Sequence, residues 1–194
     1  METIGIFGGS FNPVHIGHVM IASYLTQWKV VDKVWLTISP LNPFKVAADD
    51  LIPDVTRLAM LKVACSAAPD LQICDIELSM PKPSYTINTL RVLSKKYPRK
   101  RFKLIIGSDN WNSFSKWKDY EKILEDYGVI VYPRPGHPVQ HKLVDGMELL
   151  SPPTINLSST FVRSAIAKGR DMSCFLPQGV FDFIKTNNLY ATKQ

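Results

Sequence analysis

The residues best suited to chemistry lie near the start of the chain, where two histidines follow a pair of glycines. Gly8 and Gly9 end a short apolar segment, and His15 and His18 stand three residues apart just after it. Glycines at a strand end let the main chain approach a phosphate closely, and the next helix directs its free N–H groups there. Both histidines share one helix face, where each imidazole can donate a hydrogen bond to a phosphoryl oxygen. This segment therefore predicts a phosphate-binding site.

Two other interpretations of the histidine pair stay open at this point. An isolated pair with this spacing is often one core and one surface histidine, and a metal site needs a third ligand that is not visible nearby. The glycine-rich strand–turn–helix setting favours phosphate binding over both. Gly17, between the histidines, leaves room for a flat group such as a purine against the main chain.

A second candidate phosphate site lies about 140 residues later, in Ser158-Ser159-Thr160-Phe161-Val162-Arg163. By themselves the hydroxyl residues are typical of a helix N-cap, and Ser159 is the residue expected to cap this helix. A helix start also offers hydroxyl and N–H donors, and Arg163, one turn later, can hold phosphate oxygens. The two segments together predict a site for a polyphosphate.

The elements that must position these residues alternate between apolar strands and amphipathic helices. Strands are predicted over 3–7, 34–38, 71–76, 102–106 and 129–132, and helices over 21–28, 84–97 and from Asp54, Ser159 and Pro177 onward. The polar stretch 137–146 reads as a loop. This alternation predicts an α/β fold, a Rossmann-like doubly wound parallel sheet covered on both faces. The candidate residues follow strands or start helices, which is where such folds bind ligands.

Length and composition limit the number of domains and the class of protein. A chain of 194 residues with 45% hydrophobic and 21% charged residues fits one globular domain, 1–194, with a helical C-terminal portion at about 158–190. The absence of a long apolar run or a secretory signal predicts a cytoplasmic protein with no membrane partner. The three cysteines, Cys65, Cys74 and Cys174, form no C-x-x-C pair, so neither a disulfide framework nor a zinc knuckle is expected.

The net charge of +6 leaves several partners open. A basic surplus suits nucleic acid, anionic lipid or phosphorylated small molecules, and it also occurs without any such role. The densest basic run, 95–101, falls where a helix gives way to a strand and is read as a solvated loop. No aromatic-interleaved basic patch is visible, so no nucleic-acid partner is expected.

The two phosphate segments resemble the H-x-G-H and S-S-T-x-x-R signatures of the nucleotidylyltransferase superfamily. The middle of the chain is similar to bacterial nicotinate-nucleotide adenylyltransferases in segments 42–45, 83–90, 105–109 and 134–136, and at Trp117. The resemblance covers essentially the whole chain in the same order. It implies adenylyl transfer from ATP to nicotinate mononucleotide, giving deamido-NAD and pyrophosphate, with Mg²⁺ as cofactor and a homo-oligomer as a possible assembly.

The resemblance also assigns roles to residues, without a metal site of the protein's own. The catalytic residues would be His15, His18 and Arg163, with His18 acting chiefly on the transition state. ATP would be bound by Gly8, Gly9, Ser10, Phe11, His15, Gly17, His18, Ser158, Thr160 and Arg163. Nicotinate mononucleotide would be bound by Lys45, Thr86, Asp109, Trp117 and Arg134. Trp117 would stack on the pyridine ring, and main-chain groups around Thr86 would meet its carboxylate.

Two positions depart from the family pattern. Asn12 stands where an aspartate is usual, and Phe44 replaces a frequent histidine. The amide puts any role of position 12 in metal contact or loop ordering in doubt. The alternatives are a phosphopantetheine adenylyltransferase or cytidylyltransferase, which share the outer motifs, an ATP-binding sensing module without chemistry, and a nucleic-acid-binding protein.

Overall fold

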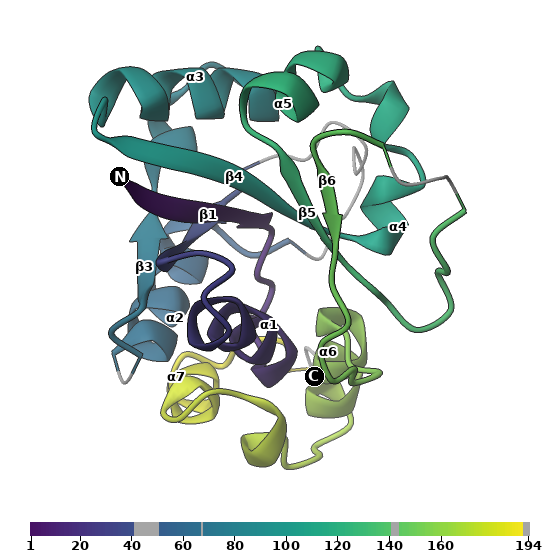
Figure 1. Ribbon diagram of the computed structural model, residues 1–194. Coiled ribbons are helices and arrows are strands. Elements are labelled where there is room, and N and C mark those ends of the chain that lie inside the picture. Colours follow the sequence, from purple (N-terminus) through teal and green to yellow (C-terminus); the bar gives the residue numbers. More distant parts are fainter. Residues whose placement is uncertain (41–50, 67, 141–143, 192–194) are drawn as a thin grey trace.

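The computed structural model describes residues 1–40, 51–66, 68–140 and 144–191 (Figure 1). The strands are β1 (Glu2–Gly9), β2 (Lys33–Ile38), β3 (Leu71–Cys74), β4 (Lys100–Gly107), β5 (Val129–Tyr132) and β6 (Met147–Leu149). The α-helices are α1 (Ile16–Gln27), α2 (Asp54–Cys65), α3 (Thr86–Lys96), α4 (Ser108–Trp111), α5 (Tyr120–Asp126), α6 (Ser159–Ala167) and α7 (Val180–Thr186). Three short 3₁₀ helices are η1 (Ile76–Ser79), η2 (Phe114–Lys116) and η3 (Ser173–Phe175).

The strands form one parallel sheet in the order β3-β2-β1-β4-β5-β6. The chain winds outward from β1 to β3, returns to β4 beside β1, and winds outward again to β6. Ile6 pairs with Leu104 and Phe7 with Ile105, so β1 and β4 end side by side. The predicted Rossmann-like doubly wound fold in a single domain is confirmed. The direction of winding reverses between β1 and β4, which is where open α/β sheets bind ligands.

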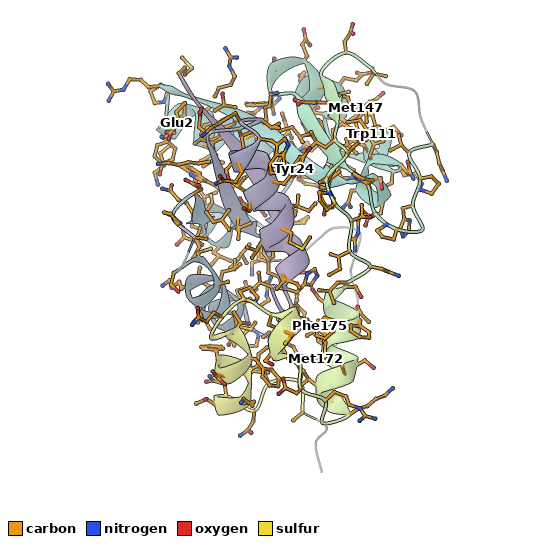
Figure 2. All side chains as sticks on the ribbon, turned by 60° about the horizontal axis from the view of Figure 1, so that its bottom comes forward. Glu2, Tyr24, Trp111, Met147, Met172 and Phe175 are labelled. Atoms are coloured by element: carbon orange, nitrogen blue, oxygen red, sulfur yellow. The ribbon has the colours of Figure 1, made fainter. Side chains whose placement is uncertain are left out.

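Successive side chains of a strand point to opposite faces of the sheet, and here the side chains on both faces are apolar. Helices therefore cover both faces. Ile4 and Ile6 of β1 belong to the cluster that includes the apolar face of α3. Phe7, on the opposite face, belongs to the cluster that includes α1, α2 and α7. Figure 1 shows α3 and α5 on one side of the sheet and α1, α2 and α7 on the other. In Figure 2, Met172 and Phe175 lie among the C-terminal helices, well separated from Trp111.

Three predicted helix starts shift by one to three residues. Asp54 is the first residue of α2 rather than its cap, and Pro53 holds the N-cap position. Ser158, not Ser159, caps α6, because its hydroxyl accepts from the N–H of Phe161 at 3.2 Å. The last helix begins at Val180 instead of Pro177. Among the described residues, no helix is long and apolar enough to cross a membrane.

Candidate active site

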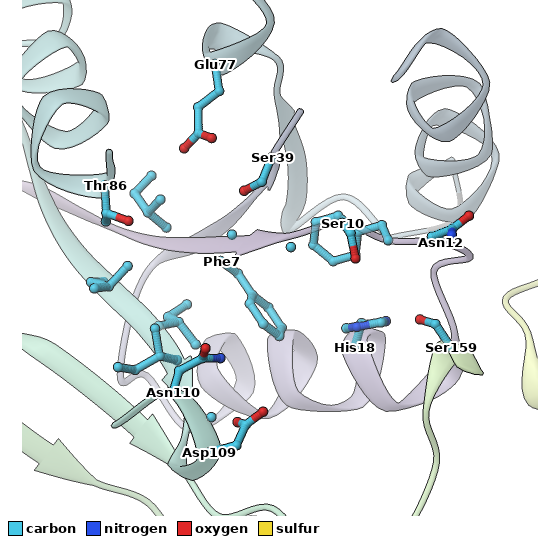
Figure 3. A pocket seen from close by; sticks show the side chains of 18 of the residues that line it. Phe7, Ser10, Asn12, His18, Ser39, Glu77, Thr86, Asp109, Asn110 and Ser159 are labelled. Carbon is cyan, nitrogen blue, oxygen red and sulfur yellow. The ribbon is translucent and has the colours of Figure 1, made fainter. Parts of the chain in front are cut away.

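A cavity of about 720 Å³ opens where β1 and β4 end. It gathers residues from both ends of the chain, and almost every residue predicted to bind a substrate lines it. Those residues are Gly8, Gly9, Ser10, Phe11, His15, His18, Thr86, Asp109, Trp117, Arg134, Ser158, Thr160 and Arg163. Figure 3 shows His18, Ser10 and Ser159 at one end of it, with Thr86 and Glu77 toward the other. Lys45 and Phe44 lie outside the described residues.

A second cavity, of about 250 Å³, shares part of its wall with the first. His15, His18, Tyr132, Arg134 and Ser158 line both spaces. The rest of its wall mixes apolar and polar residues: Gly17, Met20, Ile21, Pro133, Pro135, Pro153, Ile155 and Leu157 with His137, Thr154 and Asn156. The two histidines therefore stand at the junction of a large cavity and a smaller one.

The histidines form one stacked unit at the start of α1. Their ring centroids are 3.8 Å apart with an interplanar angle of 25°. The main-chain N–H of His15 donates to Nδ1 of His18 at 3.2 Å. Because Nδ1 of His18 accepts this bond, a neutral His18 carries its proton on Nε2. His18 thus offers one N–H donor whose position is set by the helix.

Both imidazoles are neutral near pH 7 in the absence of substrate. Burial, followed by the positive charge of Arg134, lowers the pKa of His15 to about 4. Burial, followed by the charges of His15 and Arg134, holds the pKa of His18 well below 6.5. Each ring therefore acts first as a hydrogen-bond donor. Protonation, which the sequence left open as a source of positive charge, needs an added negative charge at the site.

The glycines of the loop act differently from one another. A side chain at Gly8 would meet only the Ser39 hydroxyl, at 3.8 Å, so this main chain is open to a ligand. At Gly9 a Cβ would lie 3.1 Å from the ring of Phe11, which fills the space itself. Phe11 in turn lies edge-on to His18, with centroids 5.0 Å apart. Gly9 therefore makes room for a protein ring and Gly8 for a ligand.

The 158–163 segment is tied directly to the loop before α1. Ser159 Oγ donates to the carbonyl of Pro13 at 2.8 Å, and Arg163 Nη1 donates to the carbonyl of Asn12 at 2.8 Å. The hydroxyl of Tyr190 donates to Oδ1 of Asn12, also at 2.8 Å. Three contacts thus fasten the C-terminal helices to residues 12 and 13, and bring the two phosphate segments to one place.

The opposite wall carries the predicted ring pocket. The ring centroids of Trp117 and Phe114 are 5.4 Å apart. Trp117 and Tyr85 both line the large cavity. Tyr85 is the N-cap residue of α3 but does not cap the helix with its side chain. The first N–H groups of a helix have no partner within the helix, and its N-terminus favours an anion. The start of α3 at Thr86 is therefore suited to a carboxylate.

Known proteins resemble the chain over most of its length. The cytidylyltransferase-like family matches residues 6–165. A Bacteroides fragilis protein named "Probable nicotinate-nucleotide adenylyltransferase" is 44% identical over 178 residues, covering 91% of this chain and 88% of the relative. A protein of the same name from Bacteroides thetaiotaomicron is 43% identical, covering 93% and 90%. The chain belongs to the nicotinate-nucleotide adenylyltransferase family.

Solved structures of more distant nicotinate-nucleotide adenylyltransferases share the fold. The nicotinic acid mononucleotide adenylyltransferase of Plasmodium falciparum, solved as a complex with NaAD, aligns with a TM-score of 0.76 at 20% identity. The alignment covers 98% of each chain. The same protein complexed with APC gives a TM-score of 0.75. This likeness concerns the arrangement of the chain alone.

The departure of Asn12 from the nicotinate-nucleotide adenylyltransferase pattern has a local explanation. Its Oδ1 serves as the acceptor for Tyr190, a task that an amide and a carboxylate perform equally well. What the amide lacks is a negative charge beside the cavity. Position 12 therefore orders the loop without contributing a carboxylate.

A magnesium ion fits this site only as part of a nucleotide complex. In the part of the chain that the structure describes, no three histidine, cysteine or acidic side chains gather into a metal site. Mg²⁺ commonly keeps several waters and binds through substrate phosphates with one or two carboxylates. Asp109 supplies a buried Oδ1 without a hydrogen-bond partner among the described residues. The residues thus suit a metal that arrives with its phosphates.

Sequence reasoning missed three residues that shape the site. Glu77 is buried and accepts from Ser84 at 2.8 Å and Thr89 at 2.9 Å, on either side of Thr86. Burial raises the pKa of its carboxyl, while the hydroxyl bonds act in the opposite direction. Arg57 and Ser108 are likewise fully buried and bind main-chain atoms of loops that border the cavity. Ser108 lies within the 105–109 segment, but the resemblance assigned it no role, and no motif marks Glu77 or Arg57.

Proposed function

We propose that the protein transfers the adenylyl group of ATP to nicotinate mononucleotide, giving deamido-NAD and pyrophosphate. One observation carries the proposal: a large cavity and a smaller one meet at the His15–His18 pair. Their sizes suit a ligand built from two nucleotides. The relatives that share 43–44% identity carry the corresponding name.

ATP takes the smaller cavity and the 158–163 end of the larger one. The purine enters the small cavity that Gly17 and Ile155 line, and the phosphates lie along the open main chain of Gly8 and the start of α6. Ser158, Thr160 and Arg163 hold the β- and γ-phosphates. These residues would hold the phosphates together with a magnesium ion, which would neutralise part of their charge.

Nicotinate mononucleotide takes the other end of the large cavity. Trp117 stacks on the pyridine ring, and the start of α3 at Thr86 receives the carboxylate. Asp109 holds the ribose hydroxyls. Arg134 attracts the 5′-phosphate, and Lys45 does so from a segment outside the described residues.

The reaction is an in-line displacement. The 5′-phosphate oxygen of nicotinate mononucleotide attacks the α-phosphorus of ATP, forming the new P–O bond as the bond to pyrophosphate breaks. The nucleophile is already an anion, so no general base is needed. Catalysis consists of positioning the two phosphates and stabilising charge at the reacting phosphorus. His18 donates its Nε2–H to the α-phosphoryl oxygens, and His15 supports it from the stacked position.

The test measures pyrophosphate release from ATP and Mg²⁺ with each of three acceptors: nicotinate mononucleotide, nicotinamide mononucleotide and phosphopantetheine. Strong preference for the first, with deamido-NAD identified as product, is the expected result. Turnover with phosphopantetheine would move the chain to another nucleotidylyltransferase class. ATP binding without any product would indicate a sensing module. A cytoplasmic location and a homo-oligomeric state stay predictions.

A further inference from the structure

Three consecutive residues at the end of β4 each hold a different part of Arg134. A Cβ at Gly107 would lie 2.7 Å from Arg134 Cδ, so the arginine stem packs directly on this glycine. Ser108 Oγ accepts from the main-chain N–H of Arg134 at 2.8 Å. Asp109 Oδ2 pairs with Nη1 of the guanidinium at 3.0 Å. Stem, main chain and charged group are therefore fixed separately.

The Ser108 hydroxyl also reaches the far end of the turn that carries Arg134. It donates to the carbonyl of His137 at 2.6 Å while it accepts from Arg134. The N–H of His137 closes the turn by donating to the carbonyl of Arg134 at 3.0 Å. Ser108 is completely buried, and Gly107, the N-cap residue of its own short helix, leaves that helix without a side-chain cap. The hydroxyl therefore serves the 134–137 turn instead of its own helix.

The position of Arg134 matters on both sides of the site. Arg134 lines the large and the small cavity, and His137 lines the small one. After burial, the guanidinium charge contributes to the lowered pKa of both histidines, and it opposes the rise that burial causes in the pKa of Tyr132 of β5. Among the described residues, the other charged side chains that line the large cavity are Glu77, Asp109, Lys116, Lys118 and Arg163.

We propose that Ser108 is a positioning residue: its hydroxyl locks the main chain of Arg134 so that the guanidinium already stands at the junction of the two cavities before substrate binds. A donor held in place in advance avoids the ordering cost that a free arginine incurs on binding. The benefit to adenylyl transfer rests on the proposed function. The locking itself is a property of the ligand-free protein.

The experiment compares Ser108→Ala with a matched serine variant, Ser66→Ala. The Ser66 hydroxyl also donates to a main-chain carbonyl, that of Val63 at 2.8 Å, but Ser66 is exposed and lines neither cavity. The first readout is the NMR titration of the histidine rings in the ligand-free proteins. Ser108→Ala is expected to raise the pKa of His15 from about 4, because the guanidinium charge is no longer held against it. Ser66→Ala should leave the titration unchanged.

The second readout is steady-state kinetics with both substrates. Loss of locking should raise KM for ATP and for nicotinate mononucleotide by about three- to tenfold, with a smaller fall in kcat. Gly107→Ala should displace the same arginine by a different route, because the added Cβ would stand 2.5 Å from Asp109 Oδ1 and 2.7 Å from Arg134 Cδ. It should give the same pair of changes, and Ser108→Thr, which keeps the hydroxyl, should restore part of the loss.

Two results would overturn the inference. One is a Ser108→Ala protein whose histidine titration matches that of the wild type. The other is a KM change no larger than that of Ser66→Ala. If the wild-type protein proves not to make deamido-NAD, the proposed function fails, but the titration of the ligand-free protein still decides whether Ser108 locks Arg134.

Discussion

The main-chain N–H of His15 donates to Nδ1 of His18, so the first histidine of the pair fixes which nitrogen of the second one carries the proton. The neutral His18 ring then directs Nε2–H toward the cavity, and the stacked His15 ring limits its rotation. The tautomer and the orientation of His18 are therefore set by the start of α1.

Replacing His18 by alanine should lower kcat on the order of 100- to 1,000-fold, because the lost donor acts chiefly on charge that develops in the transition state. KM for ATP should change much less. Rates are measured by pyrophosphate release at saturating substrate. His18→Gln, which retains an N–H donor, should recover part of the loss, and a His18→Ala enzyme with wild-type kcat would contradict the proposed mechanism.

The stability of the protein should fall as the pH drops from about 6.5 toward 4. His15 has a pKa of about 4 in the folded protein, lowered first by burial, against about 6.5 when unfolded. Below pH 6.5 the unfolded chain therefore binds a proton that the folded chain does not, and folding weakens by about 1.4 kcal/mol per pH unit for each such group. Above pH 6.5 this dependence disappears.

The measurement is urea unfolding of wild type and His15→Gln at several pH values from about 4.5 to about 7.5, a range that extends above the unfolded-state pKa of histidine. The carboxylates titrate in both proteins, so the difference between the two curves isolates the imidazole. Removal of His15 should flatten the slope. Parallel curves would show that the buried ring does not stay neutral.

Arg57 should be essential for stability. Its side chain is fully buried, and its donors reach the carbonyls of Ser10, Ser39 and Ile52 and the carboxylate of Asp54. Arg57→Met leaves these acceptors without their donor, which should cost about 3–5 kcal/mol. The control is Arg91→Met, because Arg91 makes an exposed pair with Asp119 that should contribute about 0–1 kcal/mol. Equal losses in urea unfolding would refute this role.

Asn12→Asp should fold normally and change the response to magnesium. The carboxylate still accepts from Tyr190, so the loop keeps its tie to the C-terminal helices. Its added negative charge lies beside the phosphate end of the cavity, where it can serve as an oxygen ligand. Half-maximal activity should then be reached at a lower Mg²⁺ concentration, measured by titration at fixed ATP. An unchanged midpoint of the Mg²⁺ titration would show that the side chain at position 12 does not contact the metal.

The parts of the site that could be predicted consist of residues close together in the sequence. The glycines before His15 and the serines before Arg163 predict phosphate binding because their spacing matches the start of a helix. The sheet could be predicted for a similar reason, since apolar strands such as 102–106 contrast with the helices around them. β6 was missed because it spans three residues, Met147–Leu149, beside a polar loop.

The residues that escaped prediction act through main-chain atoms distant in sequence. Arg57 occupies the buried face of α2, with Met60, Leu61 and Ala64, where a charged side chain would not be expected. Its partner carbonyl at Ser10 is 47 residues away. Ser108 reaches Arg134 across 26 residues. Neither distance can be read from composition, because carbonyl acceptors carry no sequence signature.

The bond between Tyr190 and Asn12 joins residues 178 positions apart, and the ties of Ser159 and Arg163 to the same loop span 146 and 151. During synthesis the glycine loop and α1 emerge early, whereas the side chains that fasten the loop emerge last. A nascent chain that ends before α6 therefore has β1 to β6 available for folding but lacks the side chains that fasten the glycine loop. The protein would become able to hold ATP only as its final helices dock, which separates the time of folding from the time of first binding.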